Sequence, residues 1–390
     1  GVGLDPRFLS SSLKKKRPTK QELAEFVNQH TDWLPEYTFF CALRDYFGTD
    51  NWTVWDTGIR ARNTKTLKGW RKKLHKEIDA HITRQWQLHY GFKKLRNKAQ
   101  GQGIQLIGDL SFYLPHHSSL VWQFQHLFQI EKNGSMSKVS GLPDGPKAHF
   151  GRQIWCHPLY AWSDRSLQDE LVNLWKLRLR YNAQLFDWVR LDHAKGFFMY
   201  GSMDMNDAAG DKIESGPGAS VLNELISYSQ HIGLNLFAED SGDRLIGLRK
   251  TLHSFRIPGI RIFRFAYNEK RRKFTNRYAD IPSYSRNTFA QTTTHDTETL
   301  LGYLALLSVD EKKLLSKRAG IQFDSNNAKL AALFRNALIH SPAQTVIISM
   351  QDWLLTTERI NIPGTEKETG DANWSYRTSL PIEQLPKQLF

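Results

Sequence analysis

Acidic side chains follow three apolar, β-favouring stretches of the sequence, at the point where each stretch ends. They are Asp192, Glu239 with its neighbour Asp240, and Asp296. In a parallel α/β barrel the carboxyl ends of the strands form the floor of the active site, so these carboxylates are expected to converge in one pocket. Each one alone could instead cap the helix that follows its strand. Three together, with His193 and His295 beside two of them, favour a catalytic site.

Two carboxylates with a supporting third are the residues needed to break a glycosidic bond. One stays ionised and attacks or stabilises the anomeric carbon, and the other gives a proton to the departing oxygen. Arg190 lies two residues before Asp192, on the same face of the strand, and its charge favours the ionised carboxylate. Asp192 is therefore the predicted nucleophile. Glu239 follows the apolar residues 236–238, a less polar setting that suits a general acid/base.

The spacing of these residues matches no metal or nucleotide motif. It gives no Gly-rich phosphate cradle, no HExxH zinc helix and no GxSxG elbow. Cys41 and Cys156 lie far apart without a metal-like spacing, and they fit structural thiols in a reducing cytoplasm. Residues 1–16 have no apolar core of the kind found in signal peptides. We therefore expect a cytoplasmic protein with no metal and no cofactor.

The composition is that of a soluble globular protein. Of the 390 residues, 40% are hydrophobic and 24% are charged, and no run of about 18 apolar residues could span a membrane. The net charge of +14 raises the alternative of a nucleic-acid binder. The basic clusters, however, are scattered along the chain, at 14–17, 71–73, 93–94 and 271–273. This scatter favours basic surfaces that face solvent, and we expect no nucleic-acid partner. Twelve tryptophans are more than a core of this size normally needs, and flat rings can stack on sugars.

The first hundred residues read as helical. Residues 1–18 are expected to be a connector, and residues 19–103 a helical insertion. Thr19 and Glu22 have the spacing of a capping box that opens a helix. Further helices are predicted at 37–47 and, from an i+4 apolar repeat that starts at Ile78, up to the glycines near 101.

From residue 104 onwards, strands and helices alternate. Strands are predicted at 104–114, 186–193, 235–240, 259–267, 288–296 and 344–354. Helices are predicted between most of them, at 167–185, 221–231 and 328–339. This order indicates parallel βαβ units and an α/β fold, a (βα)8 TIM barrel with helical insertions. The six strands are two fewer than a closed barrel requires, and residues 115–162 form a long segment expected to be an active-site loop.

Motifs throughout the chain resemble those of the 4-α-glucanotransferases, also called amylomaltases or disproportionating enzymes, of glycoside hydrolase family 77. The three that carry most of the resemblance are VRLDHAKGF at 189–197, FAEDSG at 237–242 and TTHDTETLLGY at 293–303. Supporting matches are LIGDLSFY at 106–113, SGLPDG at 140–145, GRQIWCHPLYAW at 151–162, IPGIRIFRFAY at 257–267, INIPGT at 360–365 and NWSYR at 373–377. The motif order is also the same.

The resemblance implies a role for each candidate residue. Asp192 falls on the nucleophile, Glu239 on the acid/base, and Asp296 on the carboxylate that orients the donor sugar. The positions that it implies for substrate binding are Arg190, His193, His295 and Asp109 around the donor sugar, and Gln153 and Trp155 along the path of donor and acceptor. The expected partners are malto-oligosaccharides and glucans. Nothing in the sequence indicates the oligomeric state.

The chain also departs from the family pattern. Residues 155–158 read W-C-H-P, with His157, where the family usually has W-G-N-P; His117 stands where the family usually has an Asp after the early strand, and Ser283 where an Asn is common. The first two barrel strands of the family would precede the matched region, so the sequence predicts a fragment or a truncated relative that supplies strands three to eight from residues 104–390. The predicted function is a retaining 4-α-glucanotransferase. The alternatives are an α-glucan hydrolase of the amylase clan and an inactive glucan-binding relative.

Overall fold

The computed structural model divides the chain into two units. Unit 1 comprises Gly1–Pro143 and Cys156–Leu236, and unit 2 comprises Asp144–Trp155 and Phe237–Phe390. The residues that the structure describes are 11–143, 151–242, 245–268, 272–363, 365, 373–378 and 381–385. Parts of the predicted connector, of the predicted active-site loop and of the SGLPDG and INIPGT matches therefore lie outside the described residues. Each unit is described by itself.

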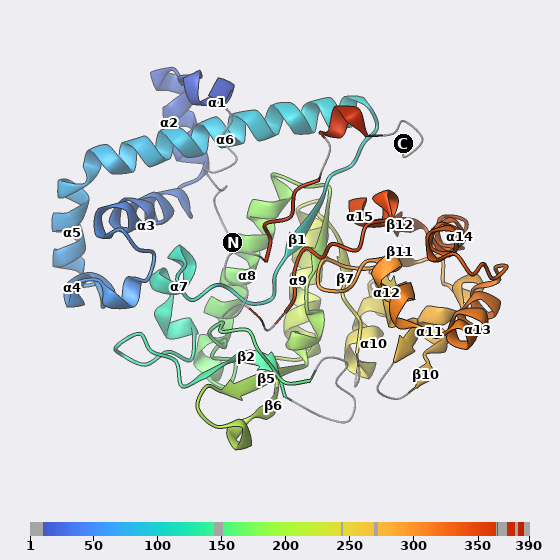
Figure 1. The fold of residues 1–390 in the computed structure, drawn as a ribbon. Helices are drawn as coiled ribbons and strands as arrows, with labels where there is room; N and C mark the ends of the chain where they lie inside the picture. Colours follow the sequence, from blue (N-terminus) through green and yellow to red (C-terminus); the bar gives the residue numbers. More distant parts are fainter. Residues whose placement is uncertain are drawn as a thin grey trace. The chain divides into compact units, whose positions relative to one another are not determined.

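Unit 1 begins with a set of helices. They are α1 (Ser11–Lys15), α2 (Lys20–Gln29), α3 (Leu34–Phe47), α4 (Thr57–Arg60), α5 (Thr64–Lys73) and α6 (His75–Gly101). The predicted capping box at the start of α2 is confirmed, because Thr19 Oγ1 accepts from the Glu22 amide at 3.1 Å while the Glu22 carboxylate accepts from the Thr19 amide at 2.7 Å. The long helix α6 runs past α1, α2 and α3 (Figure 1).

Aromatic packing explains most of the tryptophans. Seven of the twelve are buried: Trp33, Trp52, Trp55, Trp86, Trp122, Trp162 and Trp175. Trp33, for example, stacks on His89 of α6 with ring centroids 5.6 Å apart, and meets Tyr181 edge-on at 5.1 Å. Tyr181 belongs to α8 (Gln168–Ala183), so this cluster attaches the helical region to the helix that follows the first strand. The other five tryptophans are not fully buried, so only these are candidates for stacking on sugars.

Two parallel strands of unit 1 correspond to the first two predicted strands. β1 (Ile107–Leu110) pairs with β4 (Trp188–Leu191) in a register that sets Asp109 opposite Arg190. α8 lies between them in the chain, and α9 (Ala219–His231) packs beside α8. Phe186 lies against the α-carbon of Gly108, where an added Cβ would be 2.3 Å from its ring. The absence of a side chain at Gly108 therefore lets Phe186 close over β1.

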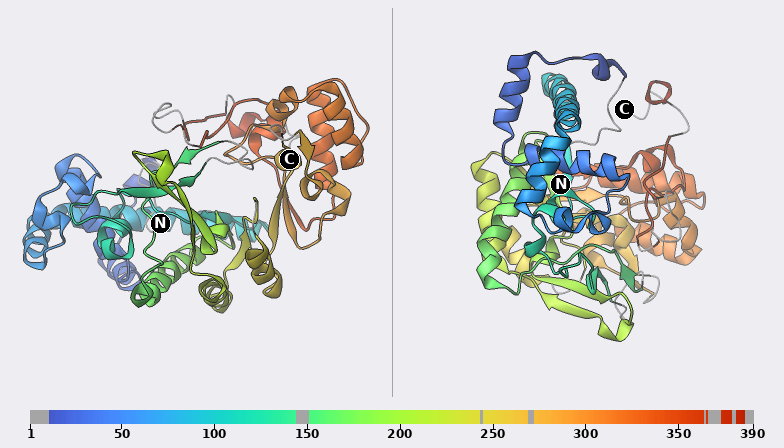
Figure 2. Two further views of the ribbon diagram at one scale, coloured as in Figure 1. Left: turned by 90° about the horizontal axis from the view of Figure 1, so that it is seen from below. Right: turned by 90° about the vertical axis from the view of Figure 1, so that its left-hand side faces the viewer.

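The segment predicted as a loop contains structure of its own. α7 (Ser119–Gln123) and β2 (Lys138–Leu142) fall within residues 115–162, and so does the short strand β3 (Gln153–Ile154) of unit 2. β2 pairs antiparallel with β5 (Met199–Asp204), which pairs with β6 (Lys212–Ser215). The residue patterns did not indicate this antiparallel ribbon of three strands, of which β5 and β6 can be followed in yellow-green in Figure 2.

The remaining parallel strands lead through unit 2. β7 (Asn235–Ala238) lies on the division between the units and is followed by β8 (Gly259–Ile262), β11 (Thr288–Gln291) and β12 (Thr345–Ile347). The six parallel strands take the order β1-β4-β7-β8-β11-β12, which confirms the α/β class and the six predicted strands, each shorter than predicted. Closure into a (βα)8 barrel stays a prediction. None of the described helices combines the length and the apolar character that crossing a bilayer requires.

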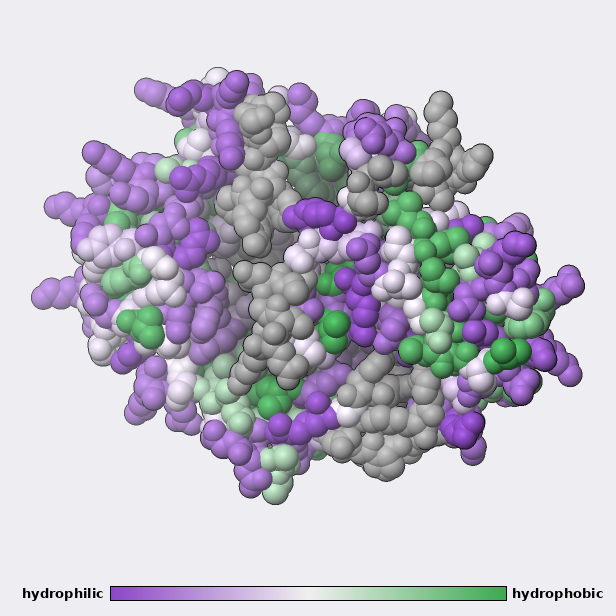
Figure 3. Space-filling model, in the orientation of Figure 1, coloured by the Kyte–Doolittle hydropathy of each residue, from purple (hydrophilic) through white to green (hydrophobic). Residues whose placement is uncertain are grey.

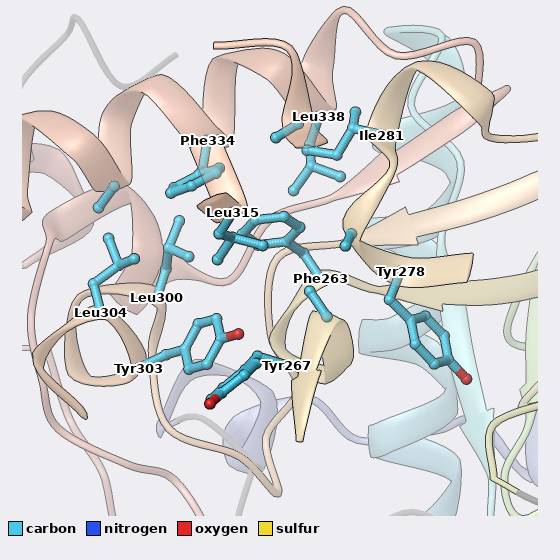
Figure 4. Packing of buried hydrophobic residues seen from close by; sticks show 14 of the residues in the cluster. Phe263, Tyr267, Tyr278, Ile281, Leu300, Tyr303, Leu304, Leu315, Phe334 and Leu338 are labelled. Atoms are coloured by element: carbon cyan, nitrogen blue, oxygen red, sulfur yellow. The ribbon is translucent and has the colours of Figure 1, made fainter. Parts of the chain in front are cut away.

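Helices cover the strands of unit 2. They are α10 (Ile246–Ser254), α11 (Asn276–Ala279), α12 (Leu300–Leu306), α13 (Val309–Ala319), α14 (Asn327–Ile339) and α15 (Met350–Leu354). Helices α11 to α14 share one core, shown in part in Figure 4, in which Phe263 packs against Phe334 with ring centroids 4.7 Å apart. On the outside, Figure 3 shows a hydrophilic face with scattered apolar groups, one of them over α12 and α13, where Leu306, Val309 and Leu314 are exposed.

Asp352 of α15 fastens this core to the end of β11. Its buried carboxylate accepts hydrogen bonds from the hydroxyls of Thr292 and Thr293, which follow β11, and from the amide of Leu300 at 2.6 Å. We expect Asp352→Ala to lower the free energy of unfolding by about 3 kcal/mol, because three buried donors would lose their acceptor. Denaturant unfolding measures this. Asp310→Ala, at an exposed carboxylate of α13, is the control, and equal losses in both variants would contradict the role given to Asp352.

Candidate active site

The ends of β1 and β4 carry a cluster of two carboxylates around one guanidinium. The Arg190 side chain is largely buried, and its Nη1 lies 3.0 and 2.9 Å from the two carboxylate oxygens of Asp109. The same nitrogen lies 2.8 Å from Asp192 Oδ1. The pairing of β1 with β4 brings Asp109 level with Arg190, and strand alternation puts Asp192 on the same face. The predicted contact between Arg190 and Asp192 is therefore present, and it favours an ionised Asp192.

The chain turns sharply immediately after Asp192. His193 has a left-handed backbone with φ of 46°, a conformation uncommon in residues other than glycine, and the 3-10 helix η5 (Ala194–Phe197) follows. This turn holds the His193 ring against Phe112 and Tyr113, at centroid distances of 6.0 and 5.8 Å. A strained backbone at a strand end is typical of residues held for function.

His157, one of the departures from the family pattern, packs behind Tyr113. The two rings are stacked with an interplanar angle of 9°, and His157 Nδ1 lies 3.0 Å from Ser140 Oγ of β2. Burial lowers the pKa of His157 to about 4, so the imidazole is neutral near pH 7. His157 therefore supports the aromatic wall beside His193 without adding a charge. His117 instead is exposed, with its Nδ1 3.9 Å from Asp50.

Glu239 and Asp240 follow β7 directly and have different surroundings. Glu239 is partly exposed, and its Oε1 accepts a hydrogen bond from the Ser241 hydroxyl at 2.7 Å. Asp240 is only 4% exposed, accepts from the Ile260 amide at 2.9 Å and is paired with Arg277. Asp240 therefore anchors the start of β8, whereas Glu239 is the more exposed of the two neighbours.

Asp296 follows β11 and is held by polar neighbours. His295 Nε2 lies 3.2 Å from its Oδ2, and the Asn361 amide donates to its Oδ1 at 2.6 Å. Burial raises the pKa of Asp296, but the hydrogen bonds from His295 and Asn361 and the charge of His295 outweigh burial, so the pKa lies below its usual value. The negative charge of Glu239 acts in the opposite direction and raises this pKa. Asp296 is therefore ionised at neutral pH.

Further residues fix the backbone and the ring beside Asp296. Arg359 donates to the Asp296 carbonyl at 2.9 Å and to the Glu298 carboxylate at 3.0 Å, and Glu298 also accepts from Arg264 at 2.8 Å. Trp374 lies over the His295 ring with centroids 5.1 Å apart. The Trp374 side chain is 60% exposed, so most of the indole is available for contact.

Gln153 and Trp155 form a pair of their own in unit 2. The Trp155 indole nitrogen donates to Gln153 Oε1 at 2.8 Å, and Gln153 is buried while Trp155 is partly exposed. This bond fixes the orientation of the indole ring. A fixed, partly exposed aromatic face suits stacking on a sugar.

The structure shows which residues cap the helices that follow the strand-end carboxylates. The helical turn after Asp192 has His193 at its N-cap, and α10 and α12 have Leu245 and Thr299 at theirs. The alternative that Asp192, Glu239 or Asp296 caps the following helix is therefore wrong. Within unit 1, Asp109, Arg190 and Asp192 come together; within unit 2, Asp296, His295 and Asn361 do, with Glu239 close enough to act on the pKa of Asp296.

No pattern in the sequence indicated a role for Asn361, Arg359 or Trp374. Asn361 and Trp374 lie in the INIPGT and NWSYR matches, which were noted only as supporting similarity. A polar residue within an otherwise apolar motif was the available signal for Asn361. In the described part of the chain, no group of three or more His, Cys, Asp or Glu side chains is arranged to hold a metal ion.

Removal of the Asn361 amide changes the titration of Asp296. Asn361→Ala deletes a hydrogen bond that stabilises the ionised carboxylate, so the pKa of Asp296 rises. If the ionised form is the active one, activity is lost as pH falls through this pKa, and the acid limb of the pH–kcat profile moves to higher pH in the variant. Asn28→Ala, at an exposed position of α2, is the control. An unshifted acid limb in Asn361→Ala would contradict a need for ionised Asp296.

Parallel βα units whose strands end in carboxylates, histidines and an arginine are typical of enzymes that act on carbohydrates. Comparison with known proteins identifies the family. The family model of glycoside hydrolase family 77, described as 4-alpha-glucanotransferase, matches residues 5–382. The chain therefore belongs to the 4-alpha-glucanotransferase family, glycosyltransferases that act on α-1,4-glucans.

Relatives and solved structures agree with this assignment. The 4-alpha-glucanotransferase of Aquifex aeolicus is 30% identical over 361 residues, which are 91% of this chain and 70% of the relative. That of Thermus thermophilus is 27% identical, over 96% of this chain and 74% of the relative. The amylomaltase of Streptococcus agalactiae, solved in complex with acarbose, superposes with a TM-score of 0.82 at 25% identity, covering 97% of this chain and 74% of that structure. The amylomaltase of Corynebacterium glutamicum shares the fold, with a TM-score of 0.66 at 16% identity over 94% of this chain and 54% of that structure.

Proposed function

We propose that the protein is a retaining 4-α-glucanotransferase that moves α-1,4-glucan segments between malto-oligosaccharides through a covalent glycosyl ester on Asp192. The observation that carries the proposal is the 2.8 Å contact between Arg190 and Asp192, since a guanidinium at this distance keeps the attacking carboxylate ionised. Arg190 is itself fixed by both oxygens of Asp109, so it cannot move away from Asp192 without breaking that pair.

The reaction has two displacements. In the first, an Asp192 oxygen forms a bond to the anomeric carbon, the bond to the leaving sugar breaks, and Glu239 gives its proton to the leaving oxygen. In the second, the ionised Glu239 takes the proton of an acceptor hydroxyl, whose oxygen attacks the anomeric carbon and releases Asp192. Two inversions restore the α configuration. This requires about 5 to 5.5 Å between the two carboxyl groups in the working enzyme, and a separation of about 9 Å would indicate inversion instead.

The other residues hold the donor sugar in this scheme. Asp296 accepts hydrogen bonds from ring hydroxyls, for which its lowered pKa and its contact with Asn361 prepare it. Binding that grows stronger as the ring distorts towards the transition state raises kcat, so Asp296 contributes to rate as well as affinity. His193 and His295 offer ring nitrogens to further hydroxyls, and Trp374 extends an apolar face beside His295.

Transfer to a sugar instead of water requires an acceptor site that excludes water, and Trp155 is the proposed platform for it, with Gln153 fixing its ring. The rival function is hydrolysis. Incubation of the protein with maltotriose distinguishes the two: transfer gives glucose and a ladder of longer oligomers, whereas hydrolysis gives only shorter products. A protein that binds maltotriose and yields neither pattern would instead be the inactive relative. We also propose a reducing cytoplasm as the location of the protein, where Cys41 and Cys156 would stay thiols.

A further inference from the structure

A basic pocket in unit 2 is separate from the proposed catalytic carboxylates. It has a volume of about 390 Å³ and lies at the amino ends of β8 and β11, where Gly259 and Thr288 begin those strands. Asp296 belongs to the opposite end of the β11 stretch. We propose that this pocket binds a phosphorylated small molecule, a phosphate monoester whose remaining part carries hydroxyl groups. This goes beyond glucan transfer and does not depend on it.

The pocket has an excess of positive charge. Among the residues that the structure describes, four arginines line the pocket together with one carboxylate, that of Asp240; the arginines are Arg249, Arg256, Arg261 and Arg277. These groups leave a formal charge of +3, with His253 counted as neutral. Burial is the main cause that lowers the pKa of the Arg261 guanidinium; the charge of Arg277 lowers it further by repulsion, and the charge of Asp240 acts in the opposite direction. An anion supplied from outside would remove this repulsion.

The position of Asp240 leaves the cations available to a ligand. Its carboxylate is turned towards the backbone of β8, where it accepts from the Ile260 amide, and a Cβ added at Gly259 would lie only 2.7 Å from its Cγ. Arg277 donates to one carboxylate oxygen, while Arg249 and Arg261 lie farther away, at 3.4 and 3.6 Å. Arg249 Nη2 also donates to the Asp240 carbonyl at 3.1 Å, and Arg261 Nη1 donates to the Ile260 carbonyl at 2.8 Å. These bonds hold the two guanidinium groups at the pocket wall and use only some of the five N–H donors of each, so others remain for a ligand.

Two residues that line the pocket have buried hydrogen-bond donors without a partner. Within the described residues, Nε of Arg277 is buried without a hydrogen-bond partner, and so is the hydroxyl of Thr288, whose residue is 1% exposed. A buried polar group without a partner costs free energy that a ligand can recover. Arg256 is exposed at the rim, and its backbone has a left-handed φ of 56°, held where α10 turns into β8.

These features select the chemistry of the ligand. Guanidinium groups bind phosphate oxygens through paired, charge-assisted hydrogen bonds, which makes arginine the preferred residue for such anions. The volume exceeds what a free phosphate needs and lies within the range for small-molecule ligands. Ser285, Asn287 and Thr288 line the remaining wall with neutral donors and acceptors, which suit the hydroxyls of a sugar-like body.

Titration calorimetry on the full chain tests the proposal with three probes: inorganic phosphate, a hexose monophosphate and the same hexose without phosphate. We expect the two phosphate compounds to bind and the neutral hexose to give no signal. Tighter binding of the hexose monophosphate identifies a phosphate monoester as the ligand, as proposed. Equal or tighter binding of inorganic phosphate overturns the monoester, and no binding of either compound at millimolar concentration overturns the site.

Two arginine variants and a matched control locate the binding. Arg256→Gln and Arg249→Gln should each weaken binding of the hexose monophosphate by about tenfold or more, since each removes a charged donor. Lys250→Gln removes one positive charge from an exposed position of the same helix, outside the pocket lining, and should leave affinity unchanged. Arg256 is exposed, so its variant remains folded even if loss of Arg249 disturbs Asp240. Unchanged affinity in Arg256→Gln, or equal weakening in Lys250→Gln, overturns the assignment.

Discussion

Replacement of Asp192 by asparagine is expected to abolish glucan transfer, with kcat for maltotriose lowered by ~10⁴-fold or more. The amide has nearly the shape of the carboxylate, but it carries no charge and cannot form the glycosyl ester. The fold should persist, because Arg190 keeps both hydrogen bonds to Asp109 when Asp192 is changed. Chromatography of the glucose and longer oligomers that form from maltotriose measures the loss of activity.

The control for this variant is Asp169→Asn, which changes an exposed aspartate in the first turn of α8 in the same unit. It should retain the activity of the unchanged protein. Thermal unfolding of both variants separates a catalytic loss from a loss of folded protein. Turnover by Asp192→Asn at the rate of the control, with the fold intact, would remove Asp192 from the mechanism and the covalent route with it.

Replacement of Glu239 by glutamine should lower transfer from maltotriose by about 10²- to 10⁴-fold, the usual contribution of a general acid. The defect should depend on the leaving group. A maltosyl fluoride donor releases fluoride without needing a proton from the enzyme, so the first displacement should proceed at a nearly unchanged rate in Glu239→Gln. The second displacement still needs a base and should stay slow. A burst of fluoride followed by slow turnover is therefore expected from a fluoride electrode.

Asp192→Asn provides the contrast, since it should give no fluoride burst with the same donor. Glu25→Gln, at an exposed position of α2, serves as a control that keeps full activity with both donors. If Glu239→Gln is impaired equally with maltotriose and with maltosyl fluoride, Glu239 does not act as the proton donor, and the role passes to another carboxylate.

Local patterns explain why much of the fold could be predicted from the sequence. The capping box of Thr19 and Glu22 depends on residues three apart, and the α6 helix on an apolar repeat that ends near Gly101. The parallel strands are short, apolar runs closed by polar residues, which is how buried strands of an α/β sheet are recognised. The contact between Arg190 and Asp192 follows from strand alternation alone.

Features that depend on distant pairing could not be predicted in this way. The ribbon of β2 and β5 joins residues about 60 positions apart, and nothing in the residues 138–142 indicates that partner. Asn361 reaches Asp296 across a similar separation. The basic pocket brings together arginines of α10, β8 and α11, which lie up to 28 positions apart in the sequence. The buried Asp240 pairs with three of these arginines, but in the sequence it stands out only as the neighbour of Glu239.

The most direct test of the account is to trap the covalent intermediate on Asp192. Glu239→Gln is incubated with maltosyl fluoride, quenched in acid, digested and examined by mass spectrometry. Because the first displacement proceeds and the second is slow, the account predicts that one maltosyl group accumulates on the peptide that contains Asp192. Fluoride release with no maltosyl group on any peptide, or a maltosyl group on a different carboxylate, would contradict it.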